Sequence, residues 1–162
     1  MSHAPPTLHM ICGKIAAGKS TLAAELARAP GTVAISEDAW LHALFADEMT
    51  SISDYVRCAA KLHRIMAPHV VSVLNAGVSV VLDFQANTID ARSWMRGILD
   101  RTDAAHLLHV LDVPDEICLQ RLRARNARGD HPFEVSEAQF HRISQHVVTP
   151  TADEGFTIRL HC

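Results

Sequence analysis

A nine-residue run near the start of the chain constrains the fold more than any other feature. GKIAAGKST, which spans Gly13–Thr21, contains the pattern G-x-x-x-x-G-K-[S/T]. Glycines let a loop wrap closely around a phosphate, and the backbone N–H groups of such a loop converge on the phosphate oxygens. The apolar run Leu8–Cys12 precedes the loop, and a run rich in Ala and Leu follows it. This context predicts a strand, a phosphate-binding loop and a helix.

The residue types in the loop indicate a nucleotide and its metal. In this pattern Lys19 reaches the β- and γ-phosphates, and the Ser20 hydroxyl ligates Mg²⁺. The positive end of the following helix adds to the field that attracts the anion. We therefore predict that ATP and Mg²⁺ bind here, with nucleotide contacts from Gly13, Ile15, Ala16, Ala17, Gly18, Lys19, Ser20 and Thr21.

Short apolar runs alternate with longer helical runs along the rest of the chain. We expect strands at 8–12, 32–35, 78–82, 106–111 and 156–160, and helices at 19–29, about 39–45, 51–75, 88–101, from about 114 and from about 136. Pro68 predicts a kink or a break within 51–75. This alternation is typical of a parallel sheet covered by helices. We therefore predict an α/β, three-layer P-loop NTPase fold of five strands.

Composition and charge narrow the class of protein. The 162 residues, of which 48% are hydrophobic, predict a single globular domain spanning 1–162. The chain start lacks the blocks of a signal peptide and no apolar run is long enough for a membrane span, so we expect a cytoplasmic protein. A net charge of −3 argues against a nucleic-acid partner. The four cysteines are scattered and are expected to be reduced thiols.

Missing signatures exclude two classes of P-loop protein. Lys61 is the only lysine outside the loop and follows Ala60, so the guanine-reading Asn-Lys-x-Asp motif of GTPases is absent. The Leu-Ser-Gly-Gly signature of transporters is absent as well. A small phosphoryl-transfer enzyme or an NTPase remains. Small kinases need a base for the acceptor hydroxyl, a carboxylate near the metal and cations that cover the transferred phosphate.

Two aspartates follow predicted strands and are candidates for the acidic roles. Ligands of open α/β sheets bind at the carboxyl ends of the strands. Asp38 follows the second strand, where it could accept the acceptor's proton or could instead cap a helix that begins near Ala39. Asp83 ends the run VVLD, which resembles a Walker B arrangement that holds Mg²⁺ through water or contacts the acceptor. A strand-end aspartate that only starts a loop is the alternative.

The stretch RLRARNARGDHPF contains four arginines: Arg121, Arg123, Arg125 and Arg128. A solvated helix face is the ordinary explanation of such a cluster. A turn containing Gly129 follows directly, and the planar guanidinium group suits phosphate clamping. We therefore predict a lid over about 121–135.

The segments GKIAAGKST, ISEDAW, VVLDF and RNARGDHPF together resemble the P-loop kinase-like group of zeta-toxins, chloramphenicol phosphotransferases and polynucleotide 5′-kinases. The chain is most similar to small, AAA-like, single-domain ATP-binding proteins of bacteria. The resemblance implies five parallel strands with the P-loop strand in the centre. It also implies that Asp38 is the general base and that Arg125 and Arg128 are lid arginines, with Arg121 as a third participant that contacts the nucleotide. Polynucleotide kinases carry an arginine three residues after the base, and Leu41 occupies that position here.

The acceptor pocket is expected between the helices of 39–75 and the carboxyl end of the third strand. Asn87 and Arg92 closely follow Asp83 and are the preferred substrate contacts beside it, whereas Arg57 and His63 are weaker candidates. We predict an ATP-dependent kinase that phosphorylates a hydroxyl of a small molecule. A nucleotide-switched ATPase or binding protein is the alternative. The sequence identifies neither the acceptor nor the oligomeric state.

Overall fold

The computed structural model describes residues 4–129 and 134–162, and these form five strands and six α-helices. The strands are β1 (Thr7–Cys12), β2 (Thr32–Ser36), β3 (Ser79–Gln85), β4 (Ala105–Leu111) and β5 (Ile158–His161). The helices are α1 (Lys19–Leu26), α2 (Glu37–Phe45), α3 (Ile52–Asn75), α4 (Ile89–Leu99), α5 (Asp115–Arg128) and α6 (Glu137–Ser144), with 3₁₀ turns η1 (Ala46–Glu48) and η2 (Ala152–Glu154).

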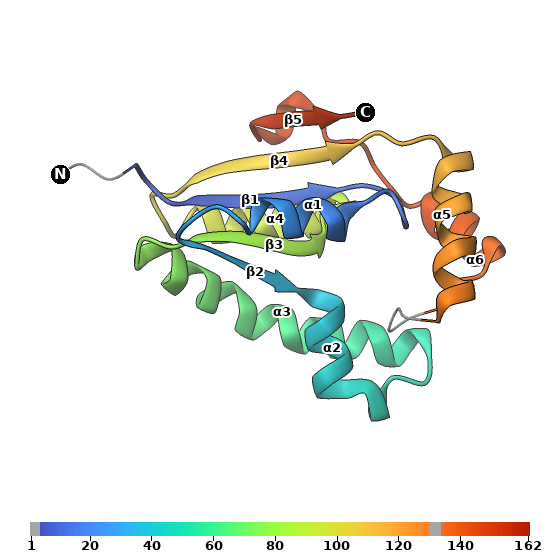
Figure 1. Ribbon diagram of the computed structural model, residues 1–162. Helices are drawn as coiled ribbons and strands as arrows, with labels where there is room; N and C mark the ends of the chain where they lie inside the picture. Colours follow the sequence, from blue (N-terminus) through green and yellow to red (C-terminus); the bar gives the residue numbers. More distant parts are fainter. Residues whose placement is uncertain (1–3, 130–133) are drawn as a thin grey trace.

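The five strands form one parallel sheet in the order β2-β3-β1-β4-β5. The P-loop strand β1 is central, and its Leu8 is in register with Val80 of β3 and His106 of β4. The prediction of five parallel strands around a central P-loop strand is therefore confirmed. Since all strands run in parallel, their carboxyl ends lie along one edge, on the right in Figure 1.

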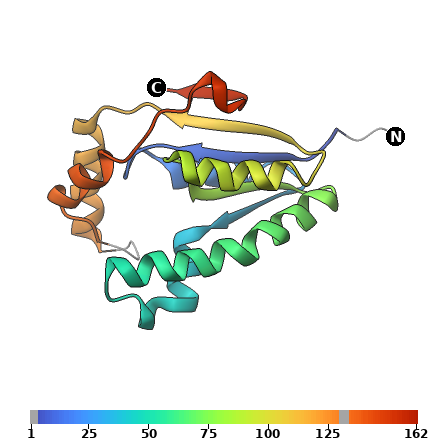
Figure 2. The same ribbon diagram turned by 180° about the vertical axis from the view of Figure 1, so that it is seen from behind.

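Side chains of the central strands alternate between the two faces of the sheet, as the pleat requires. Leu8 and Met10 of β1 belong to the large core formed with α3 and α4, which cross the face seen in Figure 2. Ile11 of β1 and Val81 of β3 instead pack with Ala23 of α1 on the other face. These two apolar layers give the predicted arrangement of helices on both faces.

A third cluster connects the P-loop to the helices at the carboxyl end of the sheet. Ala17 of the loop is buried with Cys118 and Leu122 of α5 and Phe140 of α6. Figure 1 shows α5 and α6 beyond the strand arrowheads, together with the start of α2. This packing places the arginine-bearing helix α5 beside the loop.

The structure corrects two details of the predicted elements. α3 runs unbroken through Pro68, because Leu62, Met66, Val70 and Leu74 form one buried stripe on both sides of the proline. β3 continues two residues beyond Asp83 to Gln85, so Asp83 lies inside the strand, near its carboxyl end, and does not follow it.

Two further predictions concern the whole chain. No helix of the part described is long and apolar enough to cross a membrane. All four cysteines are free thiols; Cys162 is exposed and the other three are buried.

Candidate functional site

The P-loop joins β1 to α1 and has the backbone conformation of an anion-binding loop. Ala16 and Gly18 both have positive φ angles, 63° and 105°. Alternating left-handed residues of this kind turn successive N–H groups toward one concavity. Gly18 is also the N-cap of α1 and offers no side-chain cap, so no side chain of its own covers the first N–H groups of the helix. The start of the loop is close-packed, since a Cβ at Gly13 would lie 3.1 Å from the Leu111 Cβ.

Lys19 is held inside the loop by backbone carbonyls. Its Nζ donates to the carbonyl oxygens of Gly13 at 2.8 Å and Lys14 at 2.9 Å. Burial lowers the pKa of Lys19, while the carboxylates of Asp83 and Asp38 act in the opposite direction. The ammonium group is therefore within electrostatic range of two acids that are distant in sequence.

The structure brings the P-loop hydroxyl and the two predicted acids together. Ser20 Oγ donates to Asp83 Oδ2 at 3.3 Å. Burial raises the pKa of Asp83, whereas the hydrogen bond from Ser20 and the charge of Lys19 lower it, and the charge of Asp38 raises it further. Lys19, Ser20, Asp38 and Asp83 thus form one electrostatically coupled group at the carboxyl end of the sheet.

Asp38 does not cap α2. The helix begins at Glu37, and its N-cap is Ser36, whose side chain accepts a hydrogen bond from the Ala39 N–H at 3.2 Å. The alternative that Asp38 is an N-cap is therefore wrong. Asp38 lies in the first turn of α2, one of two acids at the positive end of that helix.

The donor set around Ser20 suits Mg²⁺ in the presence of a nucleotide. A hydroxyl and a carboxylate are hard oxygen ligands, and Mg²⁺ usually combines one or two protein groups with substrate phosphates and water. Within residues 4–129 and 134–162, no group of three or more His, Cys, Asp or Glu side chains forms a metal site without a nucleotide. Ser20 and Asp83 would therefore hold the ion jointly with phosphate.

The arginines of α5 have different surroundings. Arg121 Nη1 donates to the Ala17 carbonyl at 3.2 Å, which places this side chain on the P-loop. Arg123 is exposed and pairs with the exposed Glu137 of α6. Arg125 is half-buried and Arg128 is exposed near the end of the helix. Part of the predicted lid, 130–133, lies outside the described residues.

Two predicted substrate contacts have structural partners instead. Asn87 Oδ1 accepts a hydrogen bond from the Gly13 N–H at 2.8 Å and so anchors the start of the P-loop. Arg92 is 1% exposed, and its guanidinium group donates to Glu154 at 2.7 Å and to the carbonyls of Ala86 and Val148. A guanidinium group with these partners is not available to a ligand, so we correct the assignment of Arg92.

Arg57, a weaker candidate, is exposed on α3 and pairs with Asp54 at 3.4 Å.

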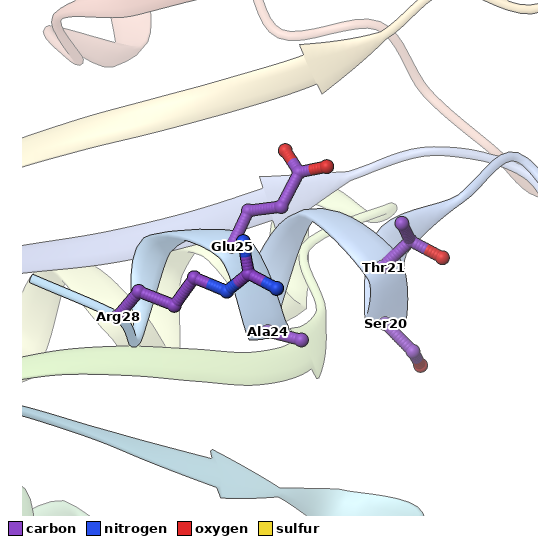
Figure 3. Close-up of a pocket in the computed structure, with 5 residues that line it drawn as sticks. All are labelled: Ser20, Thr21, Ala24, Glu25 and Arg28. Atoms are coloured by element: carbon purple, nitrogen blue, oxygen red, sulfur yellow. The ribbon is translucent and has the colours of Figure 1, made fainter.

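A surface pocket of about 440 Å³ runs along α1. Figure 3 shows its lining residues, from Ser20 and Thr21 in the first helical turn to Arg28 at the other end. The pocket borders the predicted phosphate site, and neither Asp38 nor Asp83 lines it.

Comparison with protein families gives a match over most of the chain. The family described as an AAA domain matches residues 8–150. The chain belongs to this AAA domain family. Its P-loop kinase-like fold agrees with the resemblance seen in the sequence. No curated protein matches the sequence.

Solved structures share the fold of this AAA domain, and three of them illustrate the likeness. A protein from Chloroflexus aurantiacus described as a "putative kinase" has a TM-score of 0.76 and 19% identity, with 99% of this chain and 86% of that chain covered. A chain of the Pnkp1/Rnl/Hen1 RNA repair complex has a TM-score of 0.69 and 19% identity, with 90% of this chain but only 45% of that chain covered. APS kinase CysC of Mycobacterium tuberculosis, solved with AMPPNP and APS, has a TM-score of 0.58 and 18% identity, with coverages of 79% and 77%.

Some side chains of this AAA domain that the sequence did not single out interact with the sequence neighbours of Asp38 and Asp83. Glu37 is buried and contacts His63 of α3, and the charges of Glu37 and Asp38 help burial to raise the pKa of Tyr55. Trp94 of α4 stacks on His63 with ring centroids 4.4 Å apart. The only sequence signal for Glu37 was its position beside Asp38, and nothing indicated Tyr55 or Trp94.

Proposed function

We propose that this protein transfers the γ-phosphoryl group of ATP to a hydroxyl of a small molecule. The observation that carries the proposal is the convergence of two acids on the P-loop. Ser20 and Asp83 are within hydrogen-bond distance, and the charge of Asp38 acts on both Asp83 and Lys19. A small kinase needs one carboxylate near the metal and another near the acceptor hydroxyl. Asp83 suits the first role, and Asp38 suits the second.

Each side chain has a proposed role in the transfer. MgATP supplies the phosphoryl group when it is bound. Lys19 stabilises negative charge on the phosphates, and Ser20 and Asp83 hold the ion. Asp38 orients the acceptor hydroxyl and accepts its proton. The arginines of α5, Arg125 and Arg128 with Arg121, neutralise charge that develops on the transferred group.

The acceptor we propose is a small molecule rather than a nucleic acid. The chain carries a net charge of −3, and Leu41 occupies the position where polynucleotide kinases have an arginine. Leu41 is fully buried in the core, so its side chain is unavailable to an acceptor. An acidic protein with an apolar group at this position is poorly suited to a polyanionic strand.

The test is a transfer assay with a pooled library of hydroxyl-bearing metabolites, ATP and Mg²⁺, in which mass spectrometry detects any compound that gains a phosphoryl group. We expect Lys19→Ala to abolish transfer. Asp38→Asn should lower the rate on the order of 10²-fold or more, since a general base contributes about 10²–10⁴-fold. ATP binding by Asp38→Asn should stay within about 2-fold of the wild type, because charge loss there leaves the loop contacts intact.

Asp47→Asn is the matched control, because Asp47 is an exposed acid just after the same helix. An unchanged rate in Asp38→Asn would exclude Asp38 as the base and leave Asp83 as the candidate. Tight ATP binding with only slow hydrolysis and no phosphorylated product would contradict the kinase proposal. That result would favour a nucleotide-switched binding protein.

A further inference from the structure

One histidine contacts the sequence neighbours of both acids at the proposed acceptor site. His63 Nε2 contacts Oε2 of Glu37, the residue before Asp38. The same imidazole ring lies beside Phe84, the residue after Asp83, with centroids 5.4 Å apart. α3, which carries His63, thereby connects the start of α2 to the end of β3.

The surroundings of His63 restrict its movement. Its ring is stacked on Trp94 of α4, with centroids 4.4 Å apart and an angle of 21° between the planes. Phe84 and Trp94 contact each other as well, at 5.6 Å. A ring packed against two aromatic groups has few rotamers open to it. The imidazole nitrogen is thus presented to Glu37 in one orientation.

Glu37 is the other fixed member of the contact. Its side chain is only 8% exposed, whereas that of His63 is 31% exposed. A buried carboxylate needs a partner, because an unpaired charge away from water is costly. The charge of Glu37 also helps burial to raise the pKa of Tyr55 of α3. His63 is therefore a polar partner of Glu37 that links the first turn of α2 to α3.

We infer that Glu37 and His63 form a positioning pair that fixes Asp38 and Asp83 relative to each other. The inference rests on the proposed function for the roles of the two aspartates. Neither member of the pair is required to touch a substrate. Loss of the contact would let the first turn of α2 move on α3, and displacements of about 1 Å can cost on the order of 10²-fold in rate.

The variants for the test are Glu37→Leu, His63→Phe and the double variant. His63→Phe keeps a ring against Trp94 and removes the nitrogen. We expect each single variant to lower kcat for transfer by about 10- to 100-fold, with the KM for ATP within about 2-fold of the wild type. The double variant should lose no more than the worse single variant, because both remove one contact. Glu37→Gln, which keeps an acceptor oxygen, should recover part of kcat.

His69→Gln is the matched control, because His69 is an exposed histidine on the same helix. Losses that multiply in the double variant, or kcat values equal to the wild type, would overturn the pair. A parallel rise in the KM for ATP would overturn it too, since that result indicates general damage to the fold.

A second measurement separates this inference from the proposed function. Amide hydrogen exchange over 39–45 reports the attachment of α2 without any turnover. Faster exchange there in Glu37→Leu and in His63→Phe, with β1 unchanged, supports the pair as the anchor of α2, even if the wild-type protein phosphorylates no acceptor. Unchanged exchange in both variants would overturn the pair, even if the wild type proves to be a kinase.

Discussion

Backbone conformation in the P-loop depends on two small residues with left-handed φ angles. Ala16 has φ 63°, which a residue with a Cβ adopts at a cost, and Gly18 has φ 105°, beyond the region that L-residues favour. A Cβ on Gly18 would meet only Arg121 Nη1, at 3.7 Å. Replacement of Gly18 by alanine would therefore act through backbone strain rather than through a clash.

Gly18→Ala should weaken ATP binding at least about 10-fold, because relief of the strain turns the loop N–H groups away from the phosphates. Gly77→Ala is the matched control. Gly77 follows α3 with φ 87° and has nothing within 4 Å of an added Cβ. Both variants should lose about 1 kcal/mol of unfolding free energy. Calorimetric titration with ATP should distinguish them, and equal affinities would contradict a specific role for Gly18.

Residues could be assigned from the sequence where a local pattern carries the chemistry. Lys19 and Ser20 follow from eight consecutive positions, and their surroundings match that reading. Arg92 could not be assigned in this way, because its partner Glu154 lies 62 residues further along the chain. The same limit applies to Glu37, whose contact with His63 depends on how two helices pack.

At the scale of elements, two arginines of α4 bind the C-terminal segment that contains η2. Arg92 pairs with Glu154 in η2, and Arg96 donates to the Glu154 carbonyl at 3.1 Å. The guanidinium group of Arg96 also lies 4.3 Å from the centre of the Phe156 ring. The Arg92 side chain is buried, while that of Glu154 is 18% exposed. The Glu154 carboxylate therefore balances the positive charge of a guanidinium group that has no access to water.

Glu154→Gln should destabilise the fold by about 3 kcal/mol, because it leaves a buried guanidinium group without its counter-charge. Urea denaturation measures this change. The Arg123–Glu137 pair provides the comparison, since its side chains are 60% and 50% exposed. Glu137→Gln should have little effect, as exposed ion pairs contribute little. A similar small loss in both variants would show that the Arg92 carbonyl contacts suffice.

The helices and strands could be predicted from the sequence where the local preference of the residues agrees with their packing in the fold. Thr88 caps α4 and Ser136 forms a capping box with Gln139, as their spacing indicates. Pro68 is the counterexample. Its ring opposes a continuous helix, yet the buried stripe of α3 outweighs that local preference, and this balance depends on the tertiary core.

At the scale of the whole molecule, topology explains why the site forms at all. Ser20, Asp38 and Asp83 are separated by up to 63 residues, and parallel strands place them at one edge of the sheet. Ligands of open α/β sheets bind at the carboxyl ends of the strands, and this rule needs only the direction of each strand. The sequence could therefore predict that these three residues share one site. The rule does not predict helix-to-helix contacts, and the surroundings of Asp38 depend on those.

The sheet also carries a row of histidines across three strands. His9 Nδ1 of β1 lies 3.0 Å from His109 Nε2 of β4, and His109 Nδ1 lies 2.9 Å from His161 Nε2 of β5. Each contact needs one protonated and one unprotonated nitrogen, so full protonation of the row would set N–H against N–H. Burial, and after it the charges of His9, His161 and Arg159, together lower the pKa of His109 to about 4.

This row predicts that the fold loses stability in mild acid. His109 has a folded-state pKa of about 4 against 6.5 when unfolded, so the unfolded chain binds more protons between these values. The free energy of unfolding should therefore fall by about 3 kcal/mol as the pH drops from 6.5 to 4. Urea denaturation across this range should show a flatter profile for His109→Leu. The exposed His146, replaced by leucine, should keep the wild-type slope. Parallel profiles for His109→Leu and the wild type would assign the acid sensitivity to other groups.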